Sequence, residues 1–240
     1  MKIKILSMYP DLMNLYGSGG NVRCLERHIC EAGAETEIIY ADLGDEIDFS
    51  DIDFVYVGAG TERSQKRVLQ DIKRHKSALW DYIDAGGVCL FCGNAFEMLG
   101  KSITDINGTV FEGLGYYDFH SVEEKRRVVV DTVCTCRELS SPVLGFMNKQ
   151  SRTTFIPNPL FRVTSGAGNA PDRNDEGICY KALFATQLSG PILVRNPHFR
   201  AMIEKKIYDR KQIDLLPLYF MYEEQAYKES LKGLKAGQSV

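Results

Sequence analysis

The sequence predicts an α/β protein built on a mainly parallel central sheet, with β-rich additions in its second half. Strand-like and helix-like segments alternate from Lys2 to Phe91, which is typical of βαβ units. Val88–Phe91 is continuously apolar, as expected of a strand buried on both faces at the centre of a parallel sheet. After Gly100 the chain changes to short β-like segments separated by polar turns.

The elements of the first half follow from hydrophobic periodicity. Val22, Leu25 and Ile29 recur at helical spacing, and the pair Gly86-Gly87 is a helix stop. In chain order the predicted elements are a strand at Lys2–Ser7, a helix at Gly20–Ala32, strands at Glu35–Tyr40 and Phe54–Val57, a long helix at Arg63–Ala85 and the strand Val88–Phe91.

The second half is predicted to be mainly β-structure that ends in two helices. The β-like segments are Val110–Val122, Arg127–Cys134, Val143–Met147, Leu160–Val163 and Ile178–Leu188. Ser165–Gly177 has the composition of a loop, and the helices are expected at Pro197–Asp209 and about Leu218–Leu234. No linker divides the chain, so we expect a single domain over residues 1–240.

The bulk composition is that of a soluble globular protein and excludes several classes. Of the 240 residues, 44% are apolar and 25% charged, and the net charge of -3 gives no electrostatic reason to expect nucleic acid or an anionic membrane surface. No apolar run approaches the ~20 residues that span a bilayer. Seven cysteines without a signal sequence predict reduced thiols in a cytoplasmic protein.

The stretch from Gly86 to Gly100 has the form of a nucleophile elbow. Its apolar strand ends abruptly in Cys92-Gly93-Asn94, and a short amphipathic segment follows. Such a turn presents a side chain at a helix N-terminus, where the dipole lowers a thiol pKa and backbone N–H groups can stabilise an oxyanion. Cys89-x-x-Cys92 and Cys134-x-Cys136 could instead supply zinc thiolates, but Cys89 and Cys92 should point to opposite faces of a strand. The loose phosphate-loop pattern Ala95–Ser102 reads better as helix.

Several motifs in the same order resemble the cobyric-acid-synthase-like group of class I glutamine amidotransferases. They are Tyr9-Pro10-Asp11-Leu12-Met13-Asn14-Leu15-Tyr16-Gly17 with Gly20-Asn21-Val22, Gly58-Ala59-Gly60 with Glu62-Arg63 and Gln65, the elbow, Gly145-Phe146 with Asn148 and Arg152-Thr153, Gly177 with Tyr180, and Gly190-Pro191-Ile192-Leu193 with Arg195-Asn196-Pro197. The match is closest to the glutaminase subunits of lipid II isoglutaminyl synthases.

The resemblance implies a three-layer class I glutaminase fold and a place in peptidoglycan synthesis. In that group a Cys–His pair hydrolyses glutamine. The ammonia passes to a Mur-ligase-like synthetase subunit (MurT-like), which amidates the D-glutamate of the peptidoglycan precursor. The resemblance implies no cofactor and no metal.

The catalytic motifs of the group are altered in this chain. Aligned without a gap on Phe96–Gly100, the nucleophile position falls on Gly93 and the position of a family glutamine falls on Glu97. The family's histidine position reads Ser189, which cannot act as a base near neutral pH. Thiolate and imidazole act as a unit, so these substitutions predict a glutaminase fold with reduced or absent activity.

Three functional hypotheses remain open. The first is a non-catalytic subunit that keeps the synthetase-docking surface. The second is an active glutaminase with Cys92 as nucleophile in a shifted elbow and His198 as substitute base. The third is a repurposed ligand-binding protein using the same pocket. The resemblance implies that Gly60 provides an oxyanion amide and that Arg127 anchors the glutamine carboxylate, while Glu97 introduces a charge that disfavours a thiolate.

Overall fold

A six-stranded sheet forms the centre of the protein. The computed structural model describes residues 2–236. The strand order is β11-β12-β4-β3-β1-β2, and every neighbouring pair is parallel except β11 with β12. The strands are β1 (Lys2–Met8), β2 (Glu35–Ala41), β3 (Phe54–Val57), β4 (Val88–Cys92), β11 (Ile178–Tyr180) and β12 (Leu183–Thr186). The predicted α/β class with a mainly parallel sheet is confirmed.

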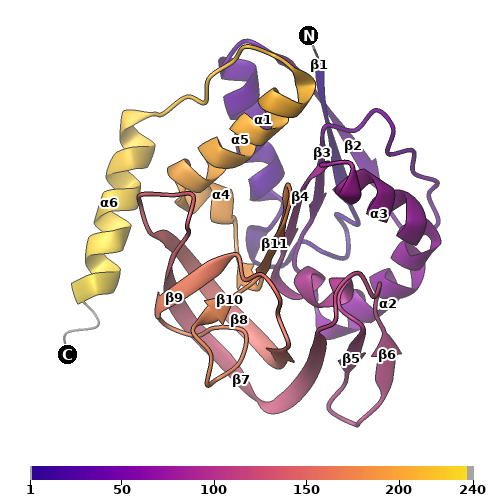
Figure 1. Ribbon diagram of the computed structural model, residues 1–240. Coiled ribbons are helices and arrows are strands. Elements are labelled where there is room, and N and C mark those ends of the chain that lie inside the picture. The colour runs from indigo at the N-terminus through magenta and orange to yellow at the C-terminus, as the bar shows by residue number, and fades with distance from the viewer. Residues whose placement is uncertain (1, 237–240) are drawn as a thin grey trace.

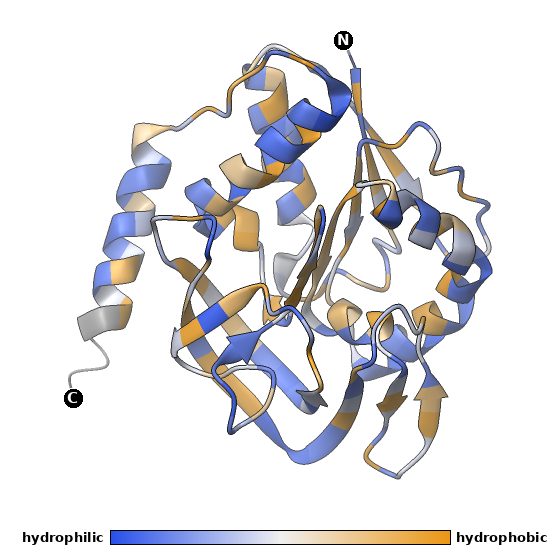
Figure 2. Cartoon of the chain, in the orientation of Figure 1, coloured by the Kyte–Doolittle hydropathy of each residue, from blue (hydrophilic) through white to orange (hydrophobic). Residues whose placement is uncertain are grey.

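Helices cover both faces of this sheet, which makes three layers (Figure 1). Alternate residues of β4 enter two separate cores: Cys89 and Phe91 in one, Leu90 and Cys92 in the other. One face is covered by α2 (Glu62–Ile72) and α3 (Lys76–Asp84), and the other by α1 (Gly20–Glu31), α4 (Ile192–Arg195) and α5 (Pro197–Lys211). The central strands are correspondingly coloured as hydrophobic in Figure 2.

The second half adds a second sheet beside the first. Its longest members pair in antiparallel fashion, with a register shift between Glu123 and Val128. Its strands are β5 (Ser102–Thr104), β6 (Val110–Glu112), β7 (His120–Thr135), β8 (Val143–Thr154), β9 (Phe161–Ser165), β10 (Asp175–Glu176) and β13 (Leu188–Ser189). The predicted β-rich additions are therefore present, although Val110–Val122 is not one segment: it comprises β6 and the start of β7.

The predicted helix Arg63–Ala85 is wrong as a single element. It is α2 and α3, separated by the 3₁₀ turn η2 (Lys73–His75). A 3₁₀ turn has about 3.0 rather than about 3.6 residues per turn, so it redirects the apolar faces of the helices that it joins. His75 is buried at this break. Ile178–Leu188 is likewise three short strands rather than one, and the predicted loop Ser165–Gly177 contains β10.

The last helix of the described residues lies against the second half of the protein. After α5 the backbone crosses to α6 (Met221–Ala236), where the Tyr227 hydroxyl donates to the Pro142 carbonyl at 2.7 Å. Besides η2, the described residues form the 3₁₀ helices η1 (Leu15–Gly17) and η3 (Gly93–Leu99). Among the helices of residues 2–236, none has the length and apolar character needed to cross a membrane.

Candidate functional site

The structure has a sharp strand-to-helix turn at Gly93, the residue that the sequence alignment predicts to stand at the nucleophile position. Strand β4 ends at Cys92, and Gly93 begins η3 with a φ of 59°, a conformation that favours glycine. A Cβ built on Gly93 would lie 3.3 Å from the Ser189 Oγ, so the two altered family positions face each other. The same Cβ would lie only 2.6 Å from the Cβ of Ala59, which therefore occupies the space of a side chain at residue 93.

Cys92 lies outside this site. Its side chain is fully buried in the apolar cluster that includes Leu188 and Phe184. Burial raises the pKa of the Cys92 thiol to about 12. The thiol is neutral at pH 7 and does not line the cavity into which the elbow opens.

His198 also lies away from the elbow. It is near the start of α5, where its Nε2 is 3.5 Å from a carboxylate oxygen of Glu224 on α6. Its ring also makes an edge contact with Tyr227, at 5.5 Å between centroids. His198 therefore contacts the last helix and not the elbow.

The remaining sequence-predicted site residues gather around one cavity of about 210 Å³. It lies between the elbow, the loop after β3 and the outer part of β8. Its lining includes Gly60, Gly93, Glu97, Arg127 and Ser189. The fold thus brings five residues that are separated in sequence to one cavity.

The backbone amide of Gly60 is already hydrogen-bonded. The Gly60 N–H donates to the Asn94 Oδ1 at 2.9 Å, and the Asn94 Nδ2 donates back to the Gly60 carbonyl at 2.9 Å. A Cβ at Gly60 would lie 2.8 Å from the backbone carbonyl oxygen of Leu12 and 2.5 Å from the Met13 Sδ, so packing requires glycine there. An oxyanion donor must point at the reacting oxygen. Here the Gly60 N–H points instead at the Asn94 side chain, which accepts its hydrogen bond.

Arg127 enters the cavity from an irregular part of β7. The register shift between Glu123 and Val128 releases the intervening residues from regular pairing. The Arg127 guanidinium pairs with Glu62 and donates to the Asn148 Oδ1 at 3.1 Å and the Gln150 Oε1 at 2.8 Å. The cation is therefore held by three side chains of the protein.

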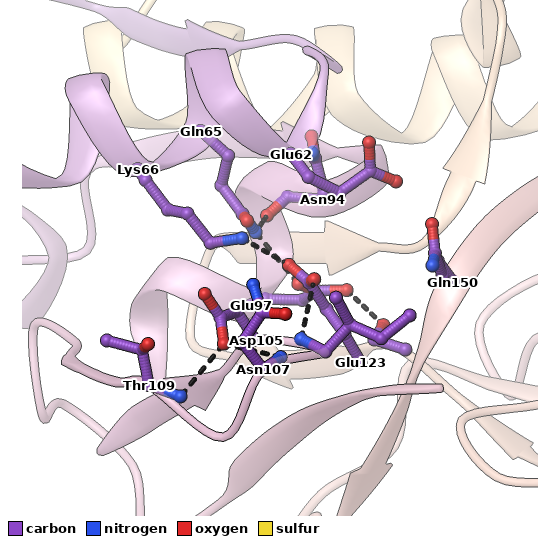
Figure 3. A network of polar contacts seen from close by, with 12 residues as sticks. Glu62, Gln65, Lys66, Asn94, Glu97, Asp105, Asn107, Thr109, Glu123 and Gln150 are labelled. Atoms are coloured by element: carbon purple, nitrogen blue, oxygen red, sulfur yellow. Dashed lines mark hydrogen bonds and ion pairs between the residues drawn. The ribbon is translucent and has the colours of Figure 1, made fainter. Parts of the chain in front are cut away.

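Glu97 is a buried carboxylate in the cavity wall. Gln65 Nε2 donates to it at 2.8 Å, and the Ser151 hydroxyl donates to its other oxygen. Burial raises the pKa of Glu97, while these hydrogen bonds and the charge of Lys149 oppose that shift. Figure 3 shows Gln65 and Lys66 reaching from α2 toward Glu97 and Glu123; the Lys66–Glu123 ion pair measures 2.5 Å.

Comparison with known proteins identifies the family. The CobB/CobQ-like glutamine amidotransferase domain matches residues 4–197, and the chain belongs to that family. A relative from Staphylococcus aureus, named lipid II isoglutaminyl synthase (glutamine-hydrolyzing) subunit GatD, is 29% identical over 216 residues, which is 90% of this chain and 88% of the relative. The protein of the same name from Streptococcus pneumoniae is 28% identical over 240 residues, covering 98% and 92%.

Solved structures agree on the fold. PurLQS from Thermotoga maritima superposes with a TM-score of 0.58 at 12% identity, covering 87% of this chain and 97% of that one. A glutamine amidotransferase from the same organism gives a TM-score of 0.54 at 11% identity, covering 98% and 92%. At these identities the likeness concerns the fold alone.

Sequence reasoning missed the roles of Asn94, Ala59 and Glu62. Glu62 and Asn148 belong to matched motifs, so their conjunction with Arg127 could have been suspected from the motifs. The hydrogen bond from the Gly60 amide to Asn94 joins residues 34 positions apart, so no local sequence pattern predicts it.

Proposed function

We propose that this chain is the glutamine-amidotransferase-like subunit of a lipid II isoglutaminyl synthase. It would pair with a Mur-ligase-like synthetase of the MurT type in the cytoplasm and support amidation of the D-glutamate of lipid II. Two relatives matching most of the chain carry the name of this synthase's GatD subunit. Matches near both ends of the chain favour one amidotransferase-like domain over residues 1–240.

We further propose that the subunit does not hydrolyse glutamine. One observation carries this proposal: Gly93 and Ser189 face each other where a thiolate and an imidazole are needed, and the Ala59 methyl fills the space of the missing side chain. A hydroxyl is a poor general base at neutral pH. The Gly60 amide is engaged by Asn94, so a third component of the reaction is also occupied.

Glutamine hydrolysis is the direct test. The purified chain and its complex with a co-expressed synthetase are assayed for glutamate release, with Cys92→Ala as a matched variant. We expect no release above the blank in either preparation, and ligation supported by ammonium chloride but not by glutamine. Release that Cys92→Ala abolishes would overturn the proposal and establish Cys92 as the nucleophile. Failure to co-purify with a synthetase would overturn the assignment as a subunit.

A reconstruction tests the geometric argument itself. Ala59→Gly, Gly93→Cys and Ser189→His are combined so that the new Cβ has space and faces an imidazole. We expect the triple variant to gain iodoacetamide reactivity at residue 93, while Gly93→Cys without Ala59→Gly folds poorly. Equal folding of the two would contradict the proposed role of the Ala59 methyl.

A further inference from the structure

Three prominent donors at the cavity, namely Lys149, Arg127 and the Gly60 amide, are engaged with the protein. Lys149, which is buried, donates from its Nζ to the carbonyls of Gly168 at 2.6 Å and Asn169 at 2.8 Å. Arg127 is held by three side chains, and the Gly60 amide by Asn94. A ligand carboxylate or oxyanion would have to displace these contacts, so the cavity is poorly prepared for an anionic group.

Two buried acceptors at the same cavity have unused hydrogen-bonding capacity. Gln187 lines it and is only 2% exposed, and its Oε1 has no hydrogen-bond partner among residues 2–236. Ser189 is also buried, and its hydroxyl makes only a long contact of 3.5 Å with the Gln187 carbonyl. A buried acceptor without a donor destabilises the folded protein. A ligand that donates an N–H group to this oxygen would remove that cost.

The charge of the cavity lining also favours a cationic ligand. Glu62, Glu97 and Glu123 line the cavity with only Arg127 and Lys149 as cations, a formal balance of three to two. Glu62 and Glu123 are paired with basic side chains. Among residues 2–236, the donors to Glu97 are the neutral groups of Gln65 and Ser151, and no cation of these residues is in direct contact with its carboxylate.

We propose that this cavity binds a small protonated amine, of which ammonium is the simplest, through Glu97 and Gln187. The inference rests on the proposed function in one respect: a subunit without glutaminase activity serves a synthetase that draws on free ammonia. The carboxylate of Glu97 balances the ligand charge, and the Gln187 Oε1 and the Ser189 hydroxyl accept its N–H groups. A neutral amide such as that of glutamine gains less from a buried carboxylate than a cation does.

Binding is measured on the full chain by NMR titration of its backbone amides at constant ionic strength. The ligands are ammonium chloride, methylammonium chloride, tetramethylammonium chloride and L-glutamine. We expect saturable shifts at the cavity amides of Gly60 and Gly93 with ammonium and methylammonium. Tetramethylammonium carries the charge but no N–H group and is expected to bind at least about tenfold more weakly, because the hydrogen bonds to a charged group are lost.

Two cavity variants and one matched control keep the test decisive. Glu97→Gln restores the family residue without changing size and is expected to weaken ammonium binding about tenfold or more. Gln187→Met removes the open acceptor and provides a second test if Glu97→Gln folds poorly. Glu112→Gln, at a carboxylate that is 81% exposed, is expected to bind as the unaltered chain does.

Three results would overturn the proposal: no saturable binding of ammonium, unchanged binding in both cavity variants, or stronger binding of L-glutamine than of ammonium. None of these depends on the glutaminase assay, so failure of this inference is distinguishable from failure of the proposed function.

Discussion

The contact between Gly93 and Ala59 allows a quantitative prediction for Gly93→Ala. A residue other than glycine at a φ of 59° costs roughly 1–2 kcal/mol. The new Cβ would also lie 2.6 Å from the Ala59 Cβ, and relieving such overpacking in a buried site costs about 1–3 kcal/mol. We therefore expect the free energy of unfolding to fall by roughly 2–5 kcal/mol.

A double-mutant cycle separates the two contributions. Ala59→Gly removes the methyl that the new Cβ would meet, so the double variant should recover the overpacking term and keep the backbone term. We expect a coupling free energy of about 1–3 kcal/mol between the two positions, measured by urea unfolding. A coupling near zero, or a Gly93→Ala variant as stable as the unaltered chain, would refute the view that Ala59 fills the nucleophile's space.

Three further predictions concern stability. Arg200→Met leaves the buried Glu204 without its ion-pair partner and should lower the free energy of unfolding in urea by about 3–5 kcal/mol. Lys205→Met, on the exposed face of the same helix, should lower it little. Equal losses in the two variants would contradict the burial argument. Burial raises the pKa of Glu176 to about 7 from 4.5. The folded protein therefore keeps a proton that the unfolded chain releases, and stability falls as pH rises from about 4.5 to about 7. Glu176→Gln should flatten this slope and add about 2–3 kcal/mol at pH 8, and parallel pH profiles would count against it. Thr61→Ala removes the N-cap of α2 and should lower the unfolding free energy by about 1 kcal/mol. Thr61→Ser keeps the capping hydroxyl and should be close to neutral. An equally large loss in Thr61→Ser would exclude capping as the cause.

Local patterning was sufficient where its signals are strong. The strand at Phe54–Val57 agrees with the structure, as does the start of the helix at Pro197. Both have strong signals: a continuous apolar run, and proline at the first helical turn. The break between α2 and α3 has no such signal, because Lys73–His75 is compatible with a continuous helix and tertiary packing selects the tighter turn.

The candidate site was likewise predictable from the sequence only in part. The elbow alignment assigned Gly93 and Glu97 to the site, and other motifs of the resemblance assigned Gly60, Arg127 and Ser189. All five residues line one cavity. Their functional roles stay predictions, as do those of Cys92 and His198. Sequence spacing alone could not choose between Cys92 and Gly93, because both stand at the end of the same strand.

The sequence by itself determined the fold class and the family, because these depend on periodicity and on residue types in a fixed order. Only the tertiary structure decided that Cys92 turns into the core, that Ala59 occupies the space beside Gly93 and that Asn94 takes the Gly60 amide. Each of these depends on the direction of a side chain across elements far apart in sequence. Such directions are fixed by strand register and by one left-handed backbone angle, which only the packed fold specifies.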